Sequence, residues 1–93
     1  MNVDKAKKLI AKQVKKGDKG YPKIAIEYFG ASTECATHVA LRFTLEEGAE
    51  VQEEVFSSKT DVRESEVIQS AIVKVIQRAD AKTVVEVQGV SAL

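Results

Sequence analysis

Residues 61–80 constrain the fold more than any other stretch, because their apolar residues recur with the spacing of one face of a helix. Asp61 is placed to cap this helix, with Glu64 reaching back in a capping box, and Thr60 is the alternative cap. Six residues between positions 67 and 76 are β-branched, which lowers intrinsic helicity. We therefore expect a helix that is stabilised by packing on a sheet, with Ile72 and Val75 among its most buried residues.

The preceding segments supply a second helix and three strands. Residues 3–16 predict a helix capped by Asn2 or Asp4, and Gly17 ends it. Residues 23–29 and 37–45 alternate between apolar and polar side chains, as half-buried strands do. Residues 50–56 predict a third strand with imperfect alternation, which a bulge near Glu53 would explain.

Residues 83–88 form a fourth run with the composition of a strand, and Gly89 ends it. The order helix, strand, strand, strand, helix, strand predicts a single α+β domain over residues 1–93. We expect a two-layer sandwich in which both helices cover one face of a mostly antiparallel four-stranded sheet. The fourth strand should run parallel to its neighbour, which is either the first or the third strand.

Composition indicates a globular cytoplasmic protein. Apolar residues make up 44% of the chain and charged residues 30%, and no apolar run is long enough to span a membrane. The N-terminal stretch lacks the features of a signal peptide, and the single cysteine, Cys35, has no internal disulfide partner. We therefore expect no membrane association and a reducing compartment.

Charge is distributed unevenly along the chain. Residues 1–20 contain seven lysines and two aspartates, a net charge of +5, whereas the remainder carries −5. The candidate residues for binding an anion or a partner are Lys5, Lys8, Lys12, Lys15, Lys16 and Lys19. These lysines either mark an anionic partner, form a solvated face, or balance the acidic residues between positions 46 and 54.

No motif for catalysis, metal binding or a cofactor is present. Cys35 and His38 have the spacing of half a zinc site, but the chain has no second cysteine or histidine. The carboxylate pairs Glu46/Glu47 and Glu53/Glu54 flank a predicted hairpin rather than a cleft. The five glycines stand singly, so no phosphate-binding loop is formed. We expect no catalytic residues, no metal and no cofactor.

The sheet face opposite the helices is the candidate interface. We expect it to carry Phe29, His38, Arg42 and Phe56. An uncovered sheet face with two open edges favours self-association.

The element order over residues 3–79 resembles the double-stranded RNA-binding domain, and ribosome hibernation factors share that order with an added first strand. The resemblance implies RNA or ribosome binding through basic helical surface. Where the RNA-binding domain has a lysine cluster at the start of its second helix, this chain has Asp61, Glu64 and Glu66.

Two functional hypotheses follow. The first is a small cytoplasmic binding or regulatory module without enzymatic activity, homodimeric, with itself or another protein as its partner. The alternative is an RNA- or ribosome-associated protein that uses the N-terminal lysines. An enzyme is the least supported class.

Overall fold

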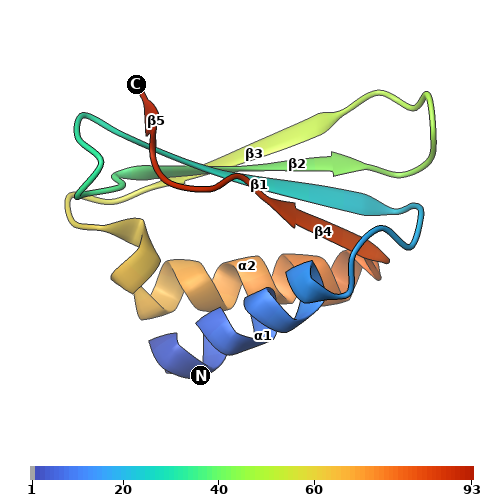
Figure 1. The fold of residues 1–93 in the computed structure, drawn as a ribbon, viewed down its shortest axis with the longest axis horizontal. Coiled ribbons are helices and arrows are strands. Elements are labelled where there is room, and N and C mark those ends of the chain that lie inside the picture. The colour runs from blue at the N-terminus through green and yellow to red at the C-terminus, as the bar shows by residue number, and fades with distance from the viewer. Residues whose placement is uncertain (1) are drawn as a thin grey trace.

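The computed structural model describes residues 2–93, and two α-helices lie on one face of its sheet (Figure 1). The helices are α1 (Val3–Lys15) and α2 (Glu66–Ala79), and a short 3-10 helix, η1 (Val62–Glu64), precedes α2. The strands are β1 (Lys23–Gly30), β2 (His38–Thr44), β3 (Gln52–Ser57), β4 (Thr83–Glu86) and β5 (Ser91–Ala92). The expected α+β fold and its α-β-β-β-α-β order are confirmed, with β5 as a strand that the sequence did not predict.

The strand order in the sheet is β3-β2-β1-β4, and β5 pairs with the end of β1 beyond β4. The pairs β1–β2 and β2–β3 are antiparallel, whereas β4 and β5 run parallel to β1. The crossover through α2 therefore returns the chain to the first strand, not to the third. As a result, β3 is left as an edge strand.

The hydrophobic core lies between the sheet and the two helices. Ile24 and Ile26 of β1 and Ile72 of α2 have no exposed surface. The helices contact each other, and α1 also contacts β4. Ile72 is therefore as buried as expected. Val75 is only half-buried, because it faces the β3 side, where no further element of residues 2–93 covers the sheet.

The start of α2 differs from the capping box that the sequence predicts. Asp61 caps η1 by accepting a hydrogen bond from the backbone N–H of Arg63, and Ser65 caps α2. The Ser65 hydroxyl oxygen accepts from the Ile68 N–H at 3.2 Å. The chain makes this extra turn because Val62, within η1, is fully buried in the core.

The orientation of β3 corrects two expectations. Its pairing with β2 is continuous from Gln52 to Ser57, so there is no bulge at Glu53. Phe56 lies opposite Val39, which is fully buried, and packs against the core. Phe56 is therefore on the helix-covered face of the sheet, and its prediction as part of the outer face is wrong.

Candidate functional site

Strand β3 is the most accessible element of the sheet. All of its residues except Phe56 are exposed, and Val55 keeps 52% of its surface open to solvent. On one side β3 pairs with β2, and on the other side no described segment pairs with it. Figure 1 shows β3 at the border of the sheet, away from the helix α1.

The hydrogen-bond alternation identifies which backbone groups of β3 are free. The Ser58 N–H donates to the Thr37 carbonyl at 2.9 Å. Because the backbone groups of a strand alternate in direction, those of the even-numbered residues of β3 face β2. The same alternation directs the Ile26 carbonyl of β1 toward β4, and that carbonyl accepts from Val87 at 2.9 Å, as expected. The N–H and C=O groups of Glu53, Val55 and Ser57 therefore point away from the sheet.

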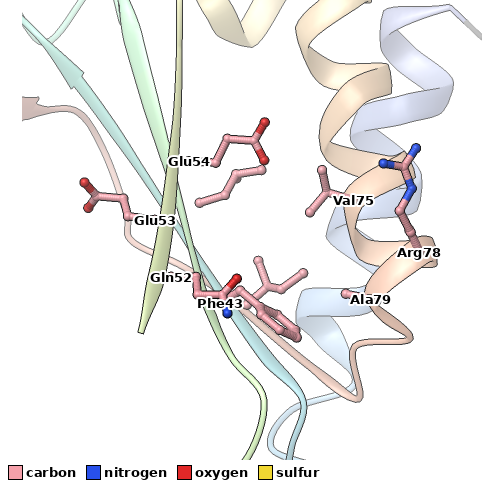
Figure 2. Close-up of a pocket in the computed structure, with 9 residues that line it drawn as sticks. Phe43, Gln52, Glu53, Glu54, Val75, Arg78 and Ala79 are labelled. Atoms are coloured by element: carbon pink, nitrogen blue, oxygen red, sulfur yellow. The ribbon is translucent and has the colours of Figure 1, made fainter. Parts of the chain in front are cut away.

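An open groove of about 460 Å³ runs between the inner face of the β2–β3 pair and helix α2 (Figure 2). Its apolar lining comes from Ile24, Leu41, Phe43, Val75 and Ala79. Its charged lining residues are Glu53 and Glu54 of β3 and Arg78 of α2. In Figure 2 the Glu54 side chain points toward Val75, while Glu53 points to the opposite face of the sheet.

Ion pairs and apolar side chains share the outer face of the sheet. Arg42 of β2 contacts Glu27 of β1 at 2.7 Å and Glu53 of β3 at 2.9 Å. Its guanidinium carbon also lies 5.9 Å from the ring centroid of Phe29. The hydrogen bond from Arg42, together with one from Ser91, holds the pKa of the Glu27 carboxyl below its usual value.

The predicted interface residues are thus only partly brought together. Phe29, His38 and Arg42 share the outer face, since Phe29 lies opposite His38 in the β1–β2 register. Phe56 lies on the other face of the sheet, as described above. The His38 imidazole Nδ1 is 2.8 Å from the Thr37 hydroxyl, and among residues 2–93 no group of three or more His, Cys, Asp or Glu is placed to hold a metal ion.

The candidate anion-binding lysines are all exposed in the structure. Five of them lie on α1 or at its C-terminal cap, and Lys19 lies in the following turn. Within residues 2–93 none of the six takes part in an ion pair. Helix α1 packs against α2 and β4, on the side of the sheet away from β3, so the acidic stretch does not neutralise these lysines by direct pairing.

A second hollow, of about 270 Å³, lies between α1 and the sheet and is lined by both apolar and polar side chains. Gln69, which is buried, donates to the Tyr28 hydroxyl at 3.3 Å and to the Val62 carbonyl at 3.1 Å. Burial raises the pKa of the Glu86 carboxyl here, and the charge of Lys7 opposes the shift. Every buried side-chain polar atom among residues 2–93 has a hydrogen-bond partner.

Comparisons with protein-family models, with curated proteins and with solved structures give no match. None of the helices in residues 2–93 is long and apolar enough to cross a membrane. The site is therefore characterised by its geometry alone. Sequence reasoning missed Val55, Glu54 and Val75 as site residues, because their importance depends on β3 being the edge strand.

Proposed function

We propose that this chain is a small cytoplasmic binding module without enzymatic activity, which acts through protein–protein contacts. Its contact surface is the open edge of β3 together with the adjoining α2–β3 groove. The observation that carries the proposal is the free row of backbone groups at Glu53, Val55 and Ser57, next to an apolar groove. An extended segment of another chain adds to such an edge through main-chain hydrogen bonds, and a groove beside it supplies side-chain contacts.

The arrangement of the carboxylates supports a role without catalysis. Glu53 and Glu54, the closest acidic pair to the groove, project to opposite faces of the sheet. Glu53 is also committed to Arg42. Acid–base chemistry by a pair of carboxylates needs both groups to converge on one substrate, and this pair diverges. A cytoplasmic location is consistent with the one half-buried free cysteine, Cys35.

The test blocks the β3 edge without disturbing the fold. Because the Val55 amide points away from β2, Val55→Pro removes a free donor but no hydrogen bond of the sheet. Val51→Pro is the matched control, since Val51 is equally exposed, at 53%, and lies just outside β3. Circular dichroism and urea unfolding of both variants establish that each one folds.

The readout is capture of proteins from native lysate by the unmodified chain and by both variants, after nuclease treatment. We expect specific proteins that bind to the unmodified chain and to Val51→Pro but are lost with Val55→Pro. Capture that is unchanged by a folded Val55→Pro would overturn the β3 edge as the contact surface. Capture that disappears with nuclease treatment would indicate a nucleic-acid partner instead.

The exposed lysines support a second candidate, an RNA- or ribosome-associated protein. Lys5, Lys8, Lys12 and Lys15 follow one another at three- and four-residue intervals on α1, and none is paired within residues 2–93. However, the start of α2 does not add to this surface. Arg63 is held by Asp61 at 2.7 Å, and Glu64 pairs with Lys7 at 2.8 Å. The protein-contact function therefore stands first.

A further inference from the structure

We propose that the β3 edge pairs with the β3 edge of a second copy of this chain, antiparallel about a twofold axis that passes through Val55. This inference rests on the proposed function, because it names the partner of the same edge. The two sheets would join into one continuous sheet, with the helices of both copies on the same side.

The two edges of the sheet differ in length and regularity. Strand β4 has only four residues, and the parallel pairing on that side stops at Glu86 before it resumes at Ser91. Strand β3 has six residues in continuous register. A short, interrupted edge resists strand addition, whereas a longer regular edge permits it. Self-pairing therefore belongs to β3.

The outer face of the sheet carries charges that oppose its stacking on a second copy. Arg42, Glu27 and Glu53 form a three-strand ion-pair network there. Stacking two such faces would remove these charges from water, and that desolvation is costly. Edge pairing leaves the network exposed and uses backbone groups that are otherwise unpaired. The edge is therefore favoured over the face.

The charges of β3 favour one register of pairing between the two copies. A twofold axis that passes through one residue places that residue opposite its own copy. Only an axis through residue 54 or 55 lets five residues of Gln52–Ser57 pair with the same five residues of the second copy. An axis on residue 54 places Glu54 opposite Glu54 of the second copy, which like-charge repulsion disfavours. An axis on residue 55 places Val55 opposite Val55 instead. It also places the free groups of Glu53 opposite those of Ser57.

In the Val55 register the flanking side chains also meet compatible neighbours. Val55, half exposed in one chain, gains an apolar partner across the axis. Glu53 lies opposite Ser57 of the second copy and diagonal to its Lys59, an exposed cation that follows β3. On the inner face Glu54 lies opposite Phe56, so neither glutamate faces a like charge. The acidic residues of β3 thus select one register rather than prevent pairing.

Disulfide trapping tests the register directly. In a Cys35→Ser background, Val55→Cys places two thiols on a hydrogen-bonded pair with Cα atoms about 5.5 Å apart, within disulfide range. Glu54→Cys is the matched control. Its two Cα atoms would be about 8 Å apart in this register, beyond disulfide reach. Val67→Cys, at an 80% exposed helix position, measures collisional cross-linking.

We expect Val55→Cys to form a disulfide-linked dimer under mild oxidation several-fold more than Glu54→Cys and Val67→Cys. Efficient cross-linking of Glu54→Cys with little from Val55→Cys would overturn the register. Cross-linking of both β3 variants at the level of Val67→Cys would overturn self-pairing through β3.

Sedimentation equilibrium of the unmodified chain provides the independent measurement. At high micromolar concentration we expect the unmodified chain to have the mass of two 10.2 kDa chains. Val51→Pro should have the same dimeric mass, and a folded Val55→Pro should have the mass of one chain. A monomer throughout would overturn self-pairing. If proteins captured from lysate still depend on Val55 in that case, the proposed binding function stands without the dimer. A Val55-centred dimer with no edge-dependent capture would instead leave self-pairing standing and remove the wider binding function.

Discussion

Ile72 is the residue at which α2 is anchored to the sheet, since it is fully buried in the hydrophobic core. Ile72→Ala removes three carbon atoms from this close-packed site, and we expect a loss of about 2–5 kcal/mol in the free energy of unfolding. Val67→Ala on the same helix should change it by no more than about 0.5 kcal/mol, because Val67 is 80% exposed. Urea unfolding of both variants checks this prediction. A loss for Ile72→Ala as small as that expected for Val67→Ala would show that Ile72 is peripheral.

Burial of the Glu86 carboxyl makes the stability of the fold depend on pH. Its folded-state pKa is raised by burial from the ordinary value of 4.5. The stability associated with its protonated form is therefore fully present below pH 4.5 and is lost as the pH rises through the folded pKa. At neutral pH the half-buried carboxylate destabilises the fold relative to an uncharged group of the same shape.

We therefore expect Glu86→Gln to be more stable than the unmodified chain at neutral pH. The difference should shrink as the pH falls through the folded pKa of Glu86 and vanish below its ordinary value. Glu50→Gln removes the same charge at an exposed position and should show no comparable trend. Urea unfolding at several pH values checks this, and a pH-independent difference would exclude titration of Glu86 as the cause.

The beginning of helix α2 is capped by one side chain. The Ser65 hydroxyl is the acceptor for the Ile68 N–H, so Ser65→Ala leaves that donor without its cap. We expect a loss of about 0.5–2 kcal/mol in the free energy of unfolding. Thr60→Ala, at the alternative cap that the sequence offered, should stay within about 0.5 kcal/mol. A larger effect at Thr60 than at Ser65 would contradict the observed helix start.

At the scale of the whole molecule, charge is separated between two sides. The exposed lysines lie on and just after α1, and the acidic residues of β3 lie at the far edge of the sheet. If α1 binds phosphate groups, the logarithm of the affinity for RNA should fall linearly with the logarithm of the salt concentration. Replacement of Lys8, Lys12 and Lys15 by Glu should then abolish the binding.

A fluorescence anisotropy titration with a short RNA duplex at several salt concentrations measures this effect. Replacement of Lys59, Lys74 and Lys82 by Glu is the control, because it changes the net charge equally at exposed positions outside α1. Equal loss of affinity in both triple variants would indicate a response to net charge only. No salt-dependent binding by the unmodified chain would remove the RNA hypothesis and leave the lysines as a solvated face.

Local patterns in the sequence were sufficient for most of the elements. Two patterns depend only on neighbouring residues in one segment: the helical repeat around Ile72 and the alternation in residues 23–29 and 37–45. They can therefore be recognised without knowledge of the fold. The two-layer α+β arrangement follows from the element order, because each apolar face needs a partner. The candidate lysines on α1 could also be predicted from the sequence, since the helix and its charges lie in one continuous stretch.

Tertiary structure decided where β3 lies, which way it faces and what it leaves open. The face of Phe56 depends on the pairing register, and a shift of one residue reverses every side chain in a strand. The position of β4 beside β1 depends on how the crossover helix packs, which involves residues distant in sequence. The β3 edge and the groove beside Val75 exist only once these long-range choices are made. The sequence alone therefore determined most of the elements, and the tertiary structure determined the candidate site.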